Sequence, residues 1–263
     1  MITLEEAKKL SQGYKIIPIS KEILSDITTP MQVLRILKET DRHCFMLESV
    51  ENQEKWGRYT FLGYAPKMEI TCTGGVMVIR NGNEEIRKVK HPRECIKEIL
   101  KEYTSPKIEG LPTFTGGLAG YFSYDYIKYS EPGLKLDAKD QEGFKDVDLM
   151  LFDKVITFDN LQQKIIVIAN ASTNNLEEDY RRCIEEIDEI ICLIQEKIPS
   201  GIVPGKITTG FTPLFTEEEY CKMVEKAKKY IYEGDIFQIV LSNRLEAGYE
   251  GSLLNAYRVL RTI

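Results

Sequence analysis

A series of short apolar segments separated by turn residues limits the possible folds of this chain more than any other feature. Three strand-forming segments alternate with Gly-Gly and Asn-Gly pairs: 69–73, Gly74-Gly75, 76–80, Asn81-Gly82 and 85–90. An Asn-Gly pair between two such segments is a strong signal for a two-residue type I′ turn, because both turn positions need positive φ. The pattern predicts antiparallel strand pairs.

Helical patterns lie before, between and after the runs of strands. Two longer strands are predicted over 148–158 and 164–169, around a polar turn. Helices are predicted over 4–10, 30–37, 92–103 and 176–198, and Thr29 and Pro30 give the second of these a cap and a first residue. Runs of strands with helices between them, without strict alternation, indicate the α+β class, with antiparallel sheets and helices outside.

The glycines and prolines after the last of these helices mark a domain boundary. Pro199 ends the helix, and residues 200–213 contain five Gly or Pro residues, which is typical of a linker. We therefore predict an amino-terminal domain over 1–199, a linker over 200–213, and the start of a second domain over 214–263.

Charge and cysteine usage exclude several classes of protein. The net charge is −6 with both signs well mixed, so no basic stripe predicts nucleic-acid binding. No amino-terminal apolar run has the length of a signal peptide or a membrane span, so we expect a cytoplasmic protein without membrane association. The six cysteines form no C-x-x-C pair and there are only two histidines, which disfavours a zinc site or a histidine-based triad.

The candidate for an active-site edge lies in residues 230–244. A helix capped by Thr216 and Glu219 ends at Gly234, and a strand is predicted from Ile236 onward. In that strand Gln238 and Ser242 share a face with aliphatic side chains. Buried polar groups need hydrogen-bond partners, so this face is a candidate for ligand contact.

This stretch resembles the beginning of the chorismate-binding domain in the anthranilate synthase component I family. Four further segments resemble the amino-terminal half of that family, in order and at the expected separations: Gly13-Tyr-Lys-Ile-Ile-Pro18, Phe45-Met-Leu-Glu-Ser49, Trp56-Gly-Arg-Tyr-Thr-Phe-Leu-Gly63 and Gly116-Gly-Leu-Ala-Gly-Tyr-Phe-Ser-Tyr-Asp125. The resemblance covers nearly the whole chain. It implies two antiparallel sheets that face each other, with helices outside.

The resemblance also implies an activity for the parent protein. That protein makes anthranilate and pyruvate from chorismate, with ammonia supplied by a glutamine amidotransferase subunit and with Mg²⁺ as cofactor. In the family the chain continues through a Pro-Ser-Pro-Tyr-Met segment into a catalytic half, which supplies the acid and base residues and the magnesium ligands. The helical pattern at 252–263 ends without a cap. We therefore expect an amino-terminal fragment that is truncated before the second half of the domain and is inactive alone.

Gln238 matches the family position that separates water-using from ammonia-using enzymes. The resemblance implies a Lys there in enzymes that add water, and a non-basic residue in those that add ammonia. A Lys of lowered pKa can deprotonate water, whereas ammonia is already a nucleophile and needs positioning. Gln238 is neutral and both donates and accepts hydrogen bonds, which favours ammonia. The alternative is a buried Gln that satisfies backbone groups.

Glu48 and Ser49 resemble the end of the family's Leu-Leu-Glu-Ser motif for feedback inhibition by tryptophan, with Met46 in place of the first Leu. The Glu48 carboxylate suits the ammonium group of a zwitterion, and the Ser49 hydroxyl suits a hydrogen bond to it. From the pattern alone an ordinary strand end is the simpler interpretation. Because the resemblance puts the rest of the pocket in the Pro-Ser-Pro-Tyr-Met segment, we expect tryptophan binding here to be weakened or absent.

Two alternatives to anthranilate synthase remain open. One is the aminodeoxychorismate synthase relative, although Phe237-Gln-Ile-Val-Leu241 is more similar to anthranilate synthase. The other is a non-catalytic module derived from the same half, which binds an effector or a partner.

Overall fold

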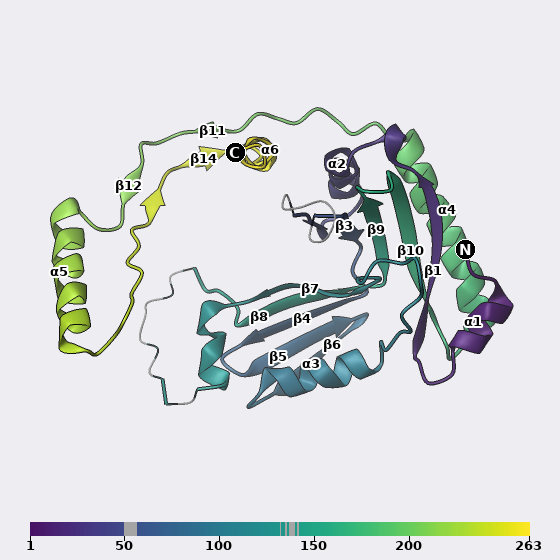
Figure 1. The fold of residues 1–263 in the computed structure, drawn as a ribbon, viewed down its shortest axis with the longest axis horizontal. Helices are drawn as coiled ribbons and strands as arrows, with labels where there is room; N and C mark the ends of the chain where they lie inside the picture. Colours follow the sequence, from purple (N-terminus) through teal and green to yellow (C-terminus); the bar gives the residue numbers. More distant parts are fainter. Residues whose placement is uncertain (50–56, 132, 135, 137–139, 141) are drawn as a thin grey trace. The chain divides into compact units, whose positions relative to one another are not determined.

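The computed structural model describes residues 1–49, 57–131, 133–134, 136, 140 and 142–263 (Figure 1). The chain divides into two compact units, Met1–Pro199 and Ser200–Ile263.

The first unit contains, in its described residues, an antiparallel sheet with the strand order β1-β10-β9-β3-β2 (Figure 1). Its strands are β1 (Ile16–Leu24), β2 (Cys44–Leu47), β3 (Tyr59–Tyr64), β9 (Lys154–Asp159) and β10 (Lys164–Ser172). Helix α4 (Leu176–Glu196) packs on β10 and β1, while α2 (Pro30–Thr40) packs on β2 and β3, and both α2 and α1 (Leu4–Leu10) contact α4. The short 3-10 turn η1 (Ser25–Ile27) follows β1.

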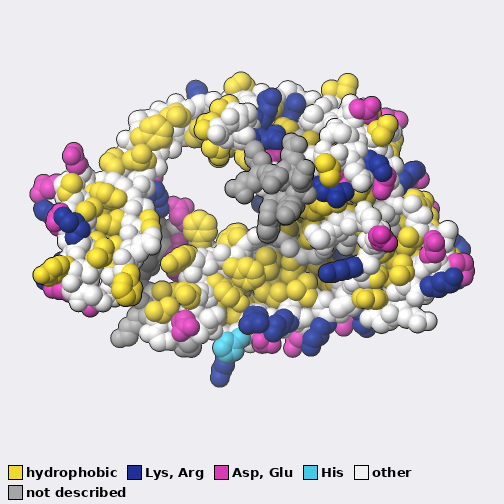
Figure 2. All heavy atoms as spheres, in the orientation of Figure 1, with side chains coloured by type: hydrophobic (Ala, Val, Ile, Leu, Met, Phe, Trp, Pro, Cys, Tyr) yellow, Lys and Arg dark blue, Asp and Glu magenta, His cyan; other side chains and the backbone are white. Residues whose placement is uncertain are grey.

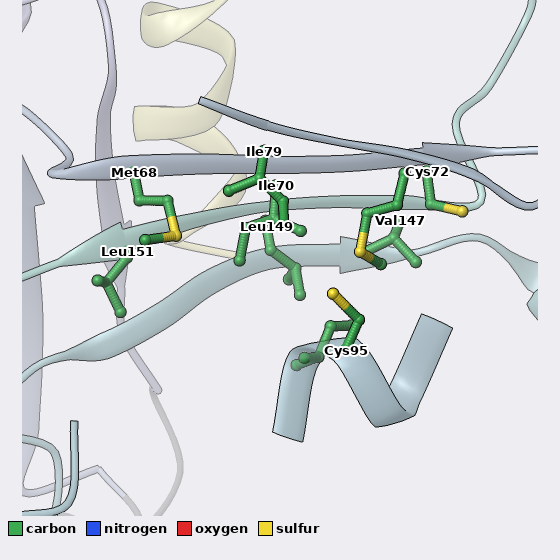
Figure 3. Close-up of a cluster of buried hydrophobic side chains, with 10 residues drawn as sticks. Met68, Ile70, Cys72, Ile79, Cys95, Val147, Leu149 and Leu151 are labelled. Carbon is green, nitrogen blue, oxygen red and sulfur yellow. The ribbon is translucent and has the colours of Figure 1, made fainter. Parts of the chain in front are cut away.

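A second antiparallel sheet in the same unit has the order β6-β5-β4-β8-β7. Its strands are β4 (Met68–Thr73), β5 (Val76–Asn81), β6 (Asn83–Lys88), β7 (Gly117–Phe122) and β8 (Val147–Phe152). Helix α3 (Pro92–Lys101) covers one face. Alternate side chains of a strand share a face, so residues of β4 and β8 gather with Cys95 of α3 in one buried cluster (Figure 3). The 3-10 helix η2 (Tyr124–Tyr129) follows β7.

The predicted α+β class, with antiparallel sheets and helices outside, is confirmed. The predicted helices are also confirmed, with ends that differ by a few residues. In α2, the side chain of Thr29 accepts a hydrogen bond from the backbone amide of Gln32 (3.3 Å), and Pro30 is the first helical residue. That cap satisfies one of the amides that the first turn of a helix leaves without a partner.

Two strand predictions were wrong in detail. Residues 148–158 form not one strand but β8 and β9, which pair with different neighbours and therefore belong to different sheets. The Asn81-Gly82 turn is not type I′, since Arg80 pairs with Glu84 and only Gly82 has positive φ, at 72°. The ladder continues to the pair Asn81–Asn83, so Gly82 is the one residue between the two strands, and it alone adopts the left-handed conformation.

The second unit consists of two helices and two small sheets. Helices α5 (Glu217–Glu233) and α6 (Leu254–Leu260) accompany the pairs β11–β14 and β12–β13. The strands are β11 (Lys206–Ile207), β12 (Thr212–Pro213), β13 (Leu245–Glu246) and β14 (Tyr249–Glu250). Residues 200–213, predicted as a linker, thus contain β11 and β12. In the part of the chain that the structure describes, no helix has the length and apolar character needed to cross a membrane.

Candidate functional site

Glu48 and Ser49 lie directly after β2, at one edge of the first sheet. The β2–β3 ladder ends where Leu47 pairs with Phe61, so both residues follow the last paired position of the strand. Glu48 is half-buried and Ser49 is exposed. Both residues are therefore at least partly accessible to solvent. Trp56, in a neighbouring segment of the resemblance, lies outside the described residues.

An aromatic cluster fixes the strand that precedes them. The Phe45 ring meets Phe152 edge-on at a centroid distance of 4.7 Å and Phe114 at 6.3 Å, and Phe61 meets Phe114 at 5.5 Å. Opposite Phe45 stands Gly63, where an added Cβ would collide with the Phe45 ring. Close packing of this kind restricts the side chains to one arrangement, so the chain leaves β2 at a defined position.

The first residues of β3 are held by an ion pair between Arg58 and Asp159. The guanidinium donates to both carboxylate oxygens, with Nη2 to Oδ2 at 2.6 Å and Nε to Oδ1 at 3.1 Å. The Asp159 side chain is only 2% exposed, and its Oδ1 also accepts from the backbone amides of Leu161 and Gln162. Burial acts to raise the pKa of the Asp159 carboxyl, but these hydrogen bonds outweigh it and hold the pKa below its usual value.

Nothing in the local sequence predicts this pair, because its two members are 101 positions apart. The only signal is the polar turn at 159–163, which requires an acceptor for its free amides. Asp159 supplies that acceptor and pairs with Arg58 as well. The pair therefore joins the start of β3 to the β9–β10 turn. In the β2–β3 ladder, the start of β3 lies close to the candidate effector residues Glu48 and Ser49.

A second buried carboxylate, that of Asp146, lies directly before β8 of the other sheet and accepts several hydrogen bonds. Its oxygens accept from Lys128 Nζ at 2.6 Å, from the Tyr129 hydroxyl at 2.7 Å and from the backbone amide of Gly74 at 2.8 Å. Burial acts to raise the pKa of Asp146, and the Lys128 and Tyr129 hydrogen bonds overcome it and lower the pKa. Burial, together with the bond to Asp146, raises the pKa of Tyr129. This network ties η2 to the β4–β5 turn, and we interpret it as structural.

Gln238 lies after α5 in the second unit, in a segment that forms no strand. The helix begins with the predicted capping box of Thr216 and Glu219 and ends at Gly234, whose φ is 85°. Beyond it, Gln238 is exposed, so the prediction of a strand with a buried Gln face was wrong for this structure. A strand needs a neighbour for its backbone groups, and in Ser200–Ile263, all of which is described, the short strands pair only with one another.

One cavity of about 250 Å³ opens on the first unit, and no predicted site residue lines it. Its lining is Met1, Ile2, Glu6, Pro18, Ser20, Glu22, Ile108, Glu109, Gly110 and Leu111. Among the described residues, no three or more His, Cys, Asp or Glu side chains form a group that could hold a metal ion.

Comparison with known proteins gives one consistent result. A protein family described as chorismate binding enzyme matches residues 42–263. Anthranilate synthase component 1 of Acetivibrio thermocellus is 35% identical over 270 residues, which cover 99% of this chain and 54% of that protein. The protein of the same name from Aquifex aeolicus is 35% identical over 267 residues, covering 99% of this chain and 53% of its own length.

The solved structures include the same kind of protein. The crystal structure of anthranilate synthase component I from Streptococcus pneumoniae TIGR4 matches with a TM-score of 0.59 and 28% identity, covering 91% of this chain and 52% of that one. The chain thus spans about half the length of the relatives that it matches.

Proposed function

This chain belongs to the family of chorismate-binding enzymes, and from that membership we propose that it forms the amino-terminal part of an anthranilate synthase component I. The complete enzyme would convert chorismate and ammonia to anthranilate and pyruvate, with loss of water, in tryptophan biosynthesis. The observation that carries this proposal is the match along 99% of the chain to proteins that share one name. That shared name favours anthranilate over aminodeoxychorismate as the product.

In this proposal Gln238 positions ammonia at the substrate. Its amide oxygen accepts a hydrogen bond from ammonia, and its amide NH₂ donates to a substrate oxygen, so the nucleophile is oriented without a base. The exposure of Gln238 in Ser200–Ile263 leaves both groups accessible to a substrate-binding half. The acid and base groups, the Mg²⁺ ligands and most substrate contacts would belong to that other half, so the 263-residue chain alone would be inactive.

The end of β2 would be part of a site for tryptophan as feedback inhibitor. Ser49 would hydrogen-bond the amino acid, and the Glu48 carboxylate would attract its ammonium group. The solvent access of both residues, and the packing that fixes Phe45 just before them, support this assignment. A glutamine amidotransferase subunit would be the partner that supplies ammonia.

The proposal is tested by following anthranilate fluorescence with chorismate, ammonium and Mg²⁺. We compare the chain alone with the chain joined to the remaining half of the A. thermocellus relative. We expect no product from the first and anthranilate from the second. Formation of aminodeoxychorismate by the joined protein would identify the other ammonia-using enzyme. A joined protein that binds tryptophan but forms neither product would favour a non-catalytic effector module.

A further inference from the structure

The cavity on the first unit has one face of β1 as its floor. Pro18, Ser20 and Glu22 alternate along β1 and all line the cavity. Ile17 and Ile19, between them, belong to the opposite face of the strand and are fully buried. The three lining residues span about 13 Å of strand. Because β1 pairs with β10 along its whole length, this floor has a fixed shape.

The other walls come from a turn far along the chain and from the residues before α1. The turn from Ile108 to Leu111 is closed by a hydrogen bond from the Leu111 amide to the Ile108 carbonyl oxygen, at 3.2 Å. Met1 and Ile2 also line the cavity, and the Ile2 carbonyl oxygen accepts from the Tyr180 hydroxyl of α4 at 2.8 Å. The volume of about 250 Å³ exceeds the roughly 150 Å³ that is enough to hold benzene. The cavity therefore has room for a small apolar body together with a polar head.

The charged part of the lining is entirely acidic. Glu6, Glu22 and Glu109 line the cavity, and no Lys or Arg occurs among the described residues that do so. Figure 2 shows Lys and Arg side chains interspersed with Asp and Glu at the end of the first unit that holds α1 and α4, at the right of the view. The cavity thus differs from the surface around it. A lining of this kind attracts cations and repels carboxylates.

Two of the three carboxylates already have partners. Hydrogen bonds from the Thr3 backbone and side chain to Glu6, at 2.7 and 2.9 Å, lower the pKa of Glu6, with a further contribution from the positive charge of the amino terminus. Glu22 pairs with Lys164 at 2.7 Å. Glu109 lies on the exposed turn and has neither an ion pair nor a hydrogen bond within the described part of the chain. One negative charge is therefore left uncompensated, which suits a ligand with a single positive charge.

We propose that this cavity binds a small organic amine, with its ammonium group at Glu109 and its apolar body between Pro18 and Ile108. The Ser20 hydroxyl, which makes no hydrogen bond to the described residues, is available as a second acceptor for the ammonium group. A ligand carboxylate would be repelled, so the site distinguishes amines from amino acids. It shares no residue with the proposed effector or nucleophile-positioning residues, and it does not depend on the proposed reaction.

The test is isothermal titration calorimetry of the 263-residue chain at low ionic strength with three matched compounds. Phenethylamine has an apolar ring and one ammonium group, 2-phenylethanol replaces that group by a hydroxyl, and phenylalanine adds a carboxylate. We expect phenethylamine to bind with a Kd of about 1 mM or tighter. The alcohol and the amino acid should each bind at least about fivefold more weakly, because one lacks the charge-assisted hydrogen bond and the other brings a repelled group.

Two matched variants test the position of the ammonium group. Glu109→Gln keeps the size of the side chain and removes the uncompensated charge, so it should weaken phenethylamine binding at least about fivefold. Glu185→Gln removes the charge of an exposed glutamate on α4 that does not line the cavity, and should change binding less than about twofold. Circular dichroism checks that both variants are folded.

Three results would overturn the proposal. The first is no binding of phenethylamine at millimolar concentration. The second is binding of 2-phenylethanol or phenylalanine as tight as that of phenethylamine, because the acidic lining would then select nothing. The third is an equal effect of Glu109→Gln and Glu185→Gln, which would indicate attraction to the net charge of the protein. The comparison of compounds uses the unmodified chain, so it decides the matter even if a variant misfolds.

Discussion

Replacing Asp159 with Ala should destabilise the first unit far more than replacing an acidic residue of an exposed ion pair. Asp159 is 2% exposed and pairs with Arg58, whose side chain is 28% exposed. Removal of one partner from a buried pair costs about 3–5 kcal/mol, because the other charge is left without compensation. Arg58 is near enough to solvent to be hydrated, so we place the loss at about 3 kcal/mol. For a unit of this size that loss lowers Tm by about 6–12 °C.

The measurement is urea unfolding followed by far-ultraviolet circular dichroism, with two further variants beside Asp159→Ala. Asp188→Ala removes the partner of Lys21. The N···O distance in that pair, 2.7 Å, is similar to that of Arg58 and Asp159, but the side chains of Lys21 and Asp188 are 45% and 54% exposed. It should cost at most about 1 kcal/mol. Asp159→Asn keeps an acceptor for the turn amides and loses the charge. Its loss in free energy of unfolding should therefore lie between those of Asp159→Ala and Asp188→Ala, at about 1.5 kcal/mol. Equal losses for Asp159→Ala and Asp188→Ala would refute the reasoning.

Four other outcomes follow from the same contacts and from the proposed function. The pKa of Asp159 is lowered on folding, so the stabilisation of the fold by its carboxylate is present above about pH 4 and is lost as the pH falls through the pKa of the folded state. The difference in free energy of unfolding between the unmodified chain and Asp159→Asn should therefore shrink below about pH 4, and a constant difference would contradict this. Gly120→Ala should lower the free energy of unfolding in urea by at least about 2 kcal/mol, because the φ of Gly120 is 148° and the added Cβ would collide with the Asp148 carbonyl oxygen. An unchanged urea midpoint would show that β7 can move away from β8. In the complete enzyme, Gln238→Lys should reduce ammonia-dependent anthranilate formation at least about tenfold, as expected for a lost positioning group, and unaltered steady-state rates would remove Gln238 from the site. Ser49→Ala should raise the tryptophan concentration for half-inhibition by about tenfold, the value of one ligand hydrogen bond, with uninhibited activity preserved; an identical inhibition curve would exclude Ser49 as a ligand.

The parts of the fold that the sequence predicts well are those with local causes. The start of α2 follows from a capping Thr29 and a Pro30 that fits the first helical position. The hairpin of β5 and β6 follows from alternating residues around Asn81-Gly82, although its strands are joined through Gly82 alone and not by a type I′ turn. In each case the signal and the structure that it specifies lie within a few residues of each other.

The parts that were missed depend on residues distant in sequence. The division between β8 and β9 has no Gly or Pro to mark it, and within residues 147–159 only Asp153 lies outside a strand. Only the identity of the pairing strands, β4 and β7 for one and β10 and β3 for the other, separates them. The Arg58–Asp159 pair, which fixes the strand next to the candidate effector residues, likewise joins positions 101 residues apart.

The segment that follows α5 shows most clearly how a strand pattern differs from a strand. Ile236, Gln238 and Val240 alternate as strand residues do, yet the backbone there forms no ladder, Phe237 is fully exposed and Val240 is 82% exposed. A hydrogen bond from the Tyr220 hydroxyl to the Leu241 carbonyl, at 3.2 Å, holds the end of this segment near α5. An exposed apolar segment of this composition gains stability only when a neighbouring strand satisfies its backbone and covers its side chains. Hydrogen exchange therefore gives a direct test: residues 236–242 should exchange fast in the chain alone and slowly in the complete enzyme, and slow exchange in both would mean that the segment already has a pairing partner.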